Sequence, residues 1–399
     1  MPNHSDDNMP RNPFSQFRPE NLDFSNLSRL TKWIAPAIAL FVLWQLASWG
    51  VSFYRDWLWF GNLEHQSVLL KVMSTRIGLF LAGFAVFLVL AAVNLRVVSR
   101  AVPRDLPDGA SDISPAAYKA AITLLIGLGW AAAALGAVYL ASRLAGEWEL
   151  FLRFFHAVPF NETEPIFDKD FSFYIFTLPA LDFLRSWLMG SLVVIGAGVL
   201  ALHYFSGSLR GERFALAGPV RSHLALLAAL VFLLVAAGHW LGRYDLLYSP
   251  TGAVYGVGYT DHHVTLPARF VLTFVALACS AVLFFNRRFK NPRIAYYAVG
   301  AWVGLSLLAG SVAPALVQRL QVEPSELARE KPYLANNIAF TRKAYGLTDI
   351  QSRSHPARGE VDPKIVADNQ GTIQNIRLWD EGPLLQSYNQ IQFFRLYYD

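Results

Sequence analysis

The sequence predicts an all-α integral membrane protein: a seven-transmembrane-helix bundle with a cytoplasmic N-terminus, followed by a small, incomplete α+β extracytoplasmic domain. Three observations lead to this fold class. The chain is 54% hydrophobic and only 16% charged, whereas soluble domains carry about 25% charged residues. Seven stretches have the roughly 20 apolar residues that a helix needs to cross a hydrocarbon core about 30 Å thick. Lys and Arg also gather in alternate connections between these stretches.

A polar cytoplasmic tail, 1–32, precedes the membrane domain, 33–317. Within a bilayer each span must be helical, because no water is present to satisfy free backbone N–H and C=O groups. The predicted spans are 33–53, 69–94, 120–141, 187–205, 223–241, 266–285 and 295–317.

Basic residues set the orientation, because short cytoplasmic loops of membrane proteins are enriched in Lys and Arg. The tail before the first span and the connections after spans two, four and six are basic, whereas the other connections mix basic with acidic residues. The C-terminus is therefore expected outside the cell (inner or plasma) membrane. We expect membrane lipid as a partner, and the formal net charge of +5 does not indicate nucleic-acid binding.

Small residues at intervals of four indicate where helices approach closely. The seventh span offers Gly300, Gly304 and Gly310, and the third offers Ala132 and Gly136. We expect these faces to hold the bundle together, with a homodimer seam as the alternative.

The middle of the predicted spans contains no ionisable side chain, although transporters and pumps place such groups there. Arg76, His203, His239 and Arg269 all fall near span ends. The bundle is thus expected to be an anchor, and transport remains the alternative.

The external loop 146–178 is predicted to lie at the membrane interface. Its first part, 147–157, is predicted to be an amphipathic helix that lies on the outer leaflet. The alternative is that its apolar face is a surface for a partner protein. The acidic stretch that follows includes Asp168 and Asp170. Carboxylates at this density can bind Ca²⁺, but no EF-hand pattern is present, so a solvated loop is the preferred interpretation.

The next external loop carries Asp261, His262 and His263. Adjacent residues suit a metal poorly, because helical ligand pairs are three or four residues apart. These residues are therefore weak metal candidates, with His239 or His156 as a possible additional ligand. Asp261 is expected instead to be an N-cap or a loop anchor, with Pro267 opening the sixth helix.

No catalytic motif or cofactor-binding motif is found, so no catalytic residue is assigned, no cofactor is expected and enzymatic activity is not favoured. The single cysteine, Cys279, excludes a disulfide within this sequence.

The extracytoplasmic region 318–399 has a soluble composition. Ser325 is expected to begin a helix that Gly346 ends, 372–378 weakly suggests a strand, and a second helix is expected at 384–394. The sequence ends on an aromatic run with little to pack against, so we expect either that the natural chain continues past Asp399 or that a partner completes the fold.

Several segments resemble the uncharacterised bacterial membrane-protein family numbered 0182, from the first span to Asp399. The matching residues are Pro159, Phe160, Asp170, Phe171, Phe173, Tyr174, Phe176, Leu178 and Pro179; Tyr259, Thr260, Asp261, His263, Leu266 and Pro267; and Pro332, Tyr333, Asn336, Asn337, Ile338, Thr341, Ala344, Tyr345 and Gly346. The resemblance implies seven membrane helices followed by a large external domain, in chains about twice as long as this one. It implies no activity, cofactor or catalytic residue, and this sequence looks truncated relative to the family.

The sequence thus favours an integral cell-membrane protein of unknown activity, an anchor or scaffold that presents an external domain to an envelope or protein partner, or to a second copy. The alternative is a transporter or membrane enzyme with a site at the external face.

Overall fold

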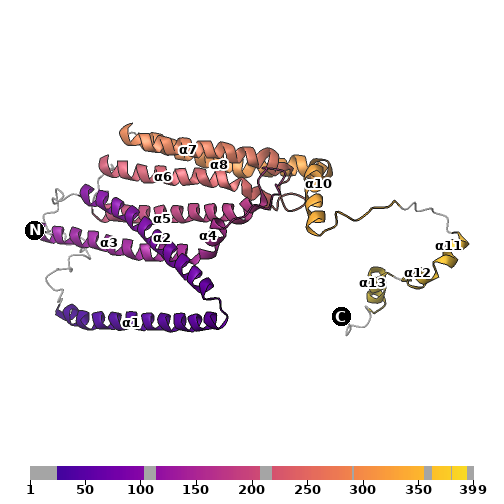
Figure 1. Ribbon diagram of the computed structural model, residues 1–399. Coiled ribbons are helices and arrows are strands. Elements are labelled where there is room, and N and C mark those ends of the chain that lie inside the picture. Colours follow the sequence, from indigo (N-terminus) through magenta and orange to yellow (C-terminus); the bar gives the residue numbers. More distant parts are fainter. Residues whose placement is uncertain are drawn as a thin grey trace, which may run out of the picture. The chain divides into compact units, whose positions relative to one another are not determined.

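The computed structural model describes residues 25–102, 114–206, 218–289, 292–354, 362–378 and 380–392. All regular elements in these ranges are helices (Figure 1). The chain divides into two compact units, Met1–Asn337 and Ile338–Asp399. The first unit contains the bundle and the candidate site.

Seven helical segments of the described residues are long and apolar enough to cross a membrane, which confirms the predicted multi-pass membrane protein. Each predicted span overlaps one of these segments, and all but the first lie entirely within one. The first six are formed by α1 (Ser25–Asn62), α2 (Gln66–Ala101), α3 (Pro115–Gly146), α5 (Leu178–Phe205), α6 (Gly218–Gly242) and α7 (Leu266–Phe289). The helices outrun the apolar stretches: α5 begins nine residues before the predicted start at 187, with Pro179 in its first turn.

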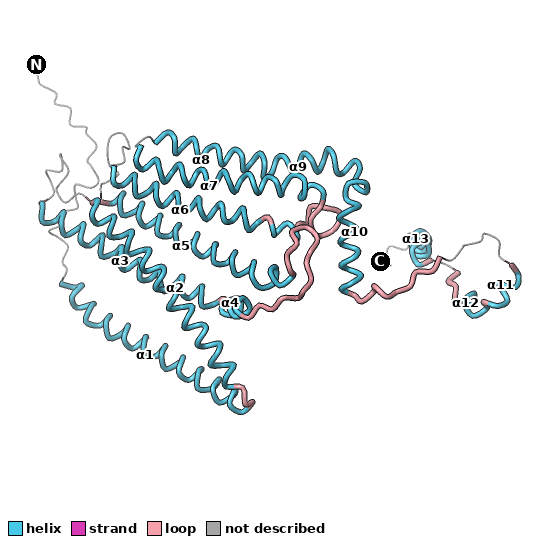
Figure 2. Tube along the Cα trace, turned by 45° about the horizontal axis from the view of Figure 1, so that its top comes forward, coloured by secondary structure: helices cyan, strands magenta, loops and turns pink. Residues whose placement is uncertain are grey.

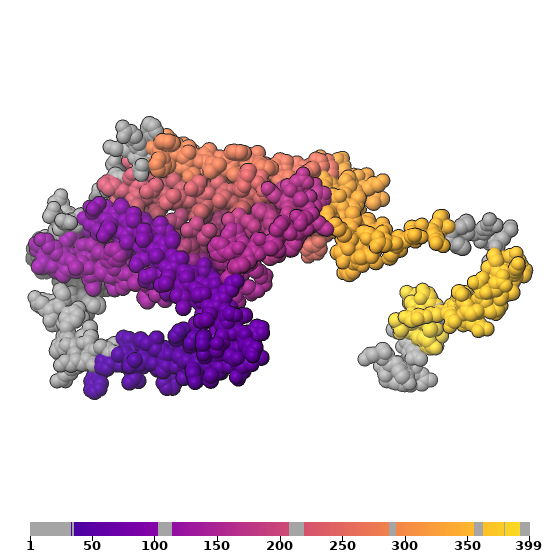
Figure 3. Space-filling view, viewed as in Figure 1, coloured from indigo at the N-terminus to yellow at the C-terminus, as the bar shows by residue number. Residues whose placement is uncertain are grey.

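Helix α1 adds little to the core of the bundle. It joins α2 at a short turn and stands apart from the other helices along most of its length (Figures 2 and 3). Its large apolar side chains are exposed, as at Trp44, which is 69% accessible. Side chains of this kind match the lipid around a membrane span better than water.

The main core lies between α2, α3 and α5. Phe87 of α2 is 1% exposed and packs against α3, where a Cβ at Gly136 would lie 3.2 Å from its ring. Trp187 of α5 donates its indole N–H to the Leu140 carbonyl of α3 at 2.8 Å. Gly136 thus lies at a close approach between α2 and α3.

The glycines of the seventh span do not share that role within this chain. A Cβ at Gly300 or Gly304 would meet nothing within 4 Å, and one at Gly310 would only touch Leu272, 3.9 Å away. The predicted contact fails because this face of the helix points away from its neighbours in the described residues. A homodimer seam at Gly300 and Gly304 stays a prediction.

The seventh span continues beyond the predicted boundary at 317 without leaving the helical conformation. It consists of α8 (Pro292–Leu307), the π turn η5 (Leu308–Val312), α9 (Ala313–Val317), a second π turn η6 (Gln318–Val322), the 3-10 turn η7 (Glu323–Ser325) and α10 (Glu326–Ala344). Figure 2 shows α10 running across the direction of α8 and α9. Gly346 follows α10 with a φ of +64°, a left-handed conformation that ends helices, as predicted.

The loop between α3 and α5 contains α4 (Trp148–Phe155) where an amphipathic helix was predicted, with an ion pair from Arg153 to Glu149. Its Phe151 is buried against Phe183 of α5, with ring centroids 6.0 Å apart. The apolar face of α4 thus rests partly on the bundle. Three single turns lie next to the spans: η2 (Phe173–Thr177) precedes α5, η3 (Tyr244–Tyr248) follows α6, and η4 (Asp261–Thr265) precedes α7.

The second unit contains α11 (Pro363–Asp368), α12 (Gln370–Gln374) and α13 (Glu381–Gln392). The α+β prediction is not supported, because 372–378 forms the end of α12 and a turn rather than a strand. Ile373 and Ile376 are three residues apart, a spacing that suits a helical turn, and a strand needs a partner that the described residues do not supply. The predicted helix at 384–394 agrees with α13, and the aromatic run 393–398 lies outside the described residues.

Candidate functional site

A polar cluster forms where the loop between α6 and α7 meets α10. The sequence places these two segments about 70 residues apart, yet among the described residues six hydrogen bonds, a ring contact and a cation–π contact join them. The loop contributes Tyr259, His262 and His263, and α10 contributes Glu330 and Tyr333. The sequence selected His262 and His263 as weak metal candidates, and Tyr333 only through the family resemblance. The fold brings these residues into one cluster.

Glu330 fixes the loop to α10. The side chain is 2% exposed, and its two carboxylate oxygens accept the Tyr259 N–H at 3.1 and 3.2 Å. A buried carboxylate requires such donors, because removing it from water is otherwise costly. The loop approaches closely enough only because Gly258 lacks a side chain: a Cβ there would lie 3.1 Å from both oxygens.

Arg329 and His263 hold the Tyr259 ring from two sides. The Arg329 guanidinium donates to the Tyr259 hydroxyl at 2.6 Å and lies 4.9 Å from the ring centroid. His263 stacks on the ring with centroids 4.2 Å apart and an interplanar angle of 22°. Tyr259 is therefore a fixed platform between a cation and an imidazole.

Tyr333 connects α10 to both histidines. Its hydroxyl lies 3.0 Å from His262 Nδ1 and 3.4 Å from His263 Nδ1. The two imidazoles are exposed and perpendicular, with centroids 5.0 Å apart. A phenol between two imidazoles can donate or accept a proton, so this is the part of the cluster best suited to acid–base chemistry.

Asp261 directly precedes the two histidines in the chain, and its side chain is buried. It is 4% exposed, and its Oδ2 has no hydrogen-bond partner among the described residues. The neighbouring Thr260 donates to Gln318 Oε1 at 2.5 Å. The predicted capping role of Asp261 is wrong, because Tyr259 and Thr260 are already helical and Asp261 lies inside the π turn η4. π turns often occur at functional sites.

Within the described ranges, no three His, Cys, Asp or Glu side chains are grouped as metal ligands. The histidines considered as additional ligands have other neighbours. His156 lies 3.2 Å from Lys71 Nζ, and His239 lies against Trp302, with centroids 6.1 Å apart. Asp261, His262 and His263 remain weak metal candidates by sequence alone.

The acidic loop before α5 is folded on itself rather than freely solvated. Glu164 is buried and accepts from the N–H groups of Ile166 and Phe167 and from the Tyr174 hydroxyl, at 2.6, 2.7 and 2.8 Å. Asp170 accepts from the Ser172 N–H at 2.7 Å and the Phe160 N–H at 3.1 Å. Asp168 is exposed and has a left-handed φ of 57°. Glu164 and Asp170 have structural partners, and no group of metal ligands includes Asp168 or Asp170 among the described residues, so a Ca²⁺ role for these two gains no support.

One group of charges, between α5, α6 and α7, was not predicted as a site from the sequence. Arg185 forms an ion pair with Asp182 at 3.0 Å and lies against Gly238, while Arg269 and Asp245 lie against Gly242. Hydropathy alone leaves Arg185 outside the fourth predicted span, because the apolar stretch begins at 187, although α5 begins at Leu178. The sequence feature that could have indicated this group of charges is the pair Gly238 and Gly242. Because these residues lack side chains, they leave room for the guanidinium groups of Arg185 and Arg269.

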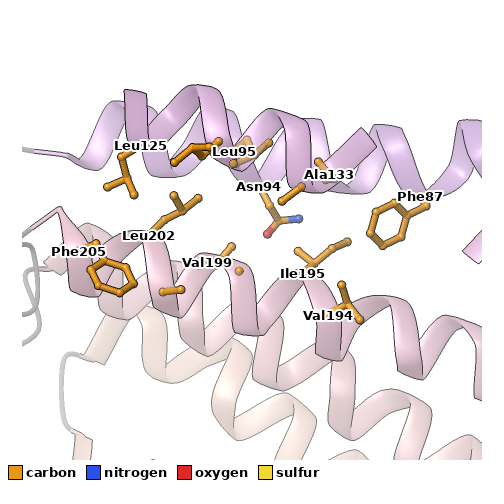
Figure 4. A pocket seen from close by; sticks show the side chains of 16 residues that line it. Phe87, Asn94, Leu95, Leu125, Ala133, Val194, Ile195, Val199, Leu202 and Phe205 are labelled. Atoms are coloured by element: carbon orange, nitrogen blue, oxygen red, sulfur yellow. The ribbon is translucent and has the colours of Figure 1, made fainter. Parts of the chain in front are cut away.

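A separate hollow of about 300 Å³ lies between α2, α3 and α5 (Figure 4). Its walls are apolar and include Ala132, one of the predicted packing residues. The polar exception is Asn94, whose Nδ2 donates to the Leu90 carbonyl at 2.7 Å and whose Oδ1 lies 2.8 Å from His223 Nε2. Both ends of this amide are occupied, so the hollow offers no free polar group for chemistry.

Comparisons with known proteins identify the family of this chain. The model of the Uncharacterised protein family (UPF0182) matches residues 33–399. A UPF0182 protein from Desulforamulus reducens is 37% identical over 389 residues, covering 90% of this chain and 40% of the relative. One from Cupriavidus necator is 36% identical over 384 residues, covering 94% of this chain and 41% of the relative.

This chain therefore spans about two fifths of the length of these curated relatives. No solved structure matches it. The family match covers all seven spans, the polar cluster and the second unit, and the chain belongs to the uncharacterised protein family UPF0182.

Proposed function

We propose that the bundle is an anchor in the cell membrane that holds α10 in a fixed direction and so presents the following chain, outside the cytoplasm, to an envelope or protein partner. The observation that carries this proposal is the attachment of α10 by Glu330, a buried carboxylate bonded to the loop backbone. The distribution of Lys and Arg supports the orientation, with the N-terminus in the cytoplasm.

A helix that merely connected two regions would not need this attachment. Arg329, Tyr333 and Asn337 add side-chain contacts to the same loop, at 2.6 Å to the Tyr259 hydroxyl, 3.0 Å to His262 and 3.2 Å to the Tyr255 carbonyl. Four residues over two turns of α10 thus bind one loop of the bundle. Such a contact resists bending of α10 about η6 and η7.

The test measures the distance between spin labels at Lys331→Cys on α10 and Leu308→Cys on η5, in a Cys279→Ala background. We expect a narrow distance distribution that Glu330→Gln broadens, because the neutral amide weakens the bond to the Tyr259 N–H. Glu326→Gln is the matched control, since Glu326 is an exposed carboxylate on the same helix. A broad distribution in the parent protein, or no response to Glu330→Gln, would refute a fixed α10.

Presentation to a partner is tested in intact cells by a photoreactive residue in place of Leu327, which is exposed on α10. We expect a discrete crosslinked species that becomes weaker with Glu330→Gln and not with Glu326→Gln. The absence of any crosslinked species would count against the anchor role.

The second candidate function is a transporter or membrane enzyme with its site at the external face. The observation in its favour is Asp261, whose buried Oδ2 has no partner in the described residues, next to His262, His263 and Tyr333. A polar group buried in this way favours a ligand or a proton.

Its test replaces His262 and His263 by Ala, with His156→Ala as the control on the other external loop. A site of this kind predicts loss of bound metal or of a measured solute flux in the first two variants while thermal unfolding is unchanged. Equal metal content and flux in all three variants would exclude this role.

A further inference from the structure

A groove of about 520 Å³ follows α6 between α5 and α7. Its walls come from all three helices, and nearly all are apolar. They include Leu184 and Leu188 of α5, Leu233 and Ala237 of α6, and Phe274 and Leu277 of α7. The groove lies within the spans, so the molecules available to fill it are lipids rather than water. Its volume is in the range of ligand pockets, which is about 300–1,000 Å³.

Among the described residues that line this groove, Arg185 is the only charged one. Its Nε and Nη2 contact Asp182 Oδ1 at 3.1 and 3.0 Å, and Nη2 also donates to Ser186 Oγ at 3.0 Å. The other terminal nitrogen, Nη1, lies against Gly238, 3.1 Å from the position that a Cβ would take. No acceptor for Nη1 is found among the described residues, so one edge of the guanidinium is free to bind an anion.

Trp240 lies at the same end of the groove as Arg185, and a second cation, Arg243, stacks on its ring. The Arg243 guanidinium stacks 3.4 Å from the centroid of the Trp240 ring, and its Nε is buried without a partner in the described part of the chain. Tryptophan typically lies at the level of the lipid headgroups. The charged end of the groove thus coincides with the level at which a lipid phosphate would be found.

The surrounding charges leave an excess of positive charge at this end. Arg185, Arg243 and Arg269 are the cations, and Asp182 and Asp245 are the anions that face them. An anionic headgroup is therefore favoured over a zwitterionic one.

We propose that this groove binds an anionic phospholipid, with one acyl chain along α6 and the phosphate at Arg185. The lipid covers the apolar walls of α5, α6 and α7 and supplies the acceptor that Nη1 lacks. Because this site lies away from the contacts between α10 and the loop, the proposal does not depend on the anchor function.

Native mass spectrometry of the delipidated full chain tests the proposal. Phosphatidylglycerol and phosphatidylcholine with identical acyl chains are added separately, and phosphatidylglycerol is expected to bind more tightly. Arg185→Gln should weaken phosphatidylglycerol binding by about tenfold, the loss expected for one charge-assisted hydrogen bond. Arg153→Gln, which removes an exposed arginine of α4, should leave the binding unchanged.

A second pair of variants tests the acyl chain. Ala237→Phe fills the groove and should weaken binding of both lipids, whereas Ala134→Phe, on an exposed face of α3, should not. Equal binding of the two lipids, or an unchanged affinity in Arg185→Gln, would overturn the proposal. Competition by inorganic phosphate as strong as that by phosphatidylglycerol would also overturn it, because the ligand would then be a soluble anion.

Discussion

Gly258 is the residue that makes the contact between the loop and α10 possible. A Cβ at this position would lie 3.1 Å from both Glu330 oxygens, tighter than ordinary contact, and the buried carboxylate has little room to move. Gly258→Ala should therefore lower the free energy of unfolding by about 1–3 kcal/mol, the usual cost of overpacking. The measurement is thermal unfolding in detergent.

The control for Gly258→Ala is Gly252→Ala in the same loop. A Cβ at Gly252 would lie 3.7 Å from Glu330, which is normal van der Waals contact, so a smaller effect is expected. Equal stability of the two variants would show that Glu330 adjusts freely and that the contact is looser than the geometry indicates.

Asp170 should make folding of the acidic loop dependent on pH. Hydrogen bonds from the Ser172 side chain and backbone, and from the Phe160 backbone, lower its pKa from 3.8 to about 2. A lowered pKa favours the ionised form in the folded state, so this stabilisation is complete above pH 3.8 and is lost as the pH falls through about 2.

Asp170→Asn should accordingly destabilise the loop at neutral pH, and its difference from the parent protein should shrink across that acidic window. Hydrogen exchange of residues 159–172 as a function of pH measures this. Asp168→Asn is the control, because Asp168 is exposed and asparagine readily adopts its left-handed φ of 57°. A difference that persists unchanged down to pH 2 would contradict the assignment.

At the level of the elements, the α2–α3 pair depends on Gly136. Gly136→Leu would drive a side chain into the Phe87 ring, 3.2 Å from the position of the Cβ, and should cost about 1–3 kcal/mol. Gly127→Leu on the same helix has nothing within 4 Å and should be neutral. Unfolding in a denaturing detergent series measures both variants, and a neutral Gly136→Leu would argue against close packing of these helices.

Elements were predictable where one local pattern determines them. The seven spans follow from long apolar stretches, and the end of α10 follows from Gly346. The start of α5 was not predictable from hydropathy, because Asp182 and Arg185 are charged and pair with each other only once the helix has formed. The strand predicted at 372–378 is wrong because Ile373 and Ile376, three residues apart, share one face of a helix but lie on opposite faces of a strand.

At the level of the whole molecule, the distribution of Lys and Arg predicts which ends of the seven spans face the outside of the membrane. In a Cys279→Ala background, Leu63→Cys and Leu347→Cys should react with a membrane-impermeant maleimide in intact cells. Ala116→Cys, near the start of α3, should react only after the cells are permeabilised. The reverse pattern would refute the orientation inferred from Lys and Arg.

The candidate site was only partly predictable, because it depends on contacts between distant segments. The sequence selected Asp261, His262 and His263 from their chemistry, and Tyr333 only through the family resemblance. Nothing local shows that Tyr333 reaches His262 or that Glu330 reaches the Tyr259 N–H, about 70 residues away. These contacts depend on how far the seventh helix runs and which way α10 turns.

The π turn η6 sets the direction in which the side chains of α10 face. Each residue of an α-helix advances the chain by about 100°, and a π turn holds one residue more than an α turn, so η6 rotates everything after it relative to an uninterrupted helix. Deleting Gln321 would remove that extra residue, restore the α pitch and leave Glu330, Tyr333 and Asn337 facing the loop. Deleting Leu327 from the regular turns of α10 would instead turn these three residues by about 100° away from the loop while leaving their chemistry intact. In this region the number of residues matters as much as their identity.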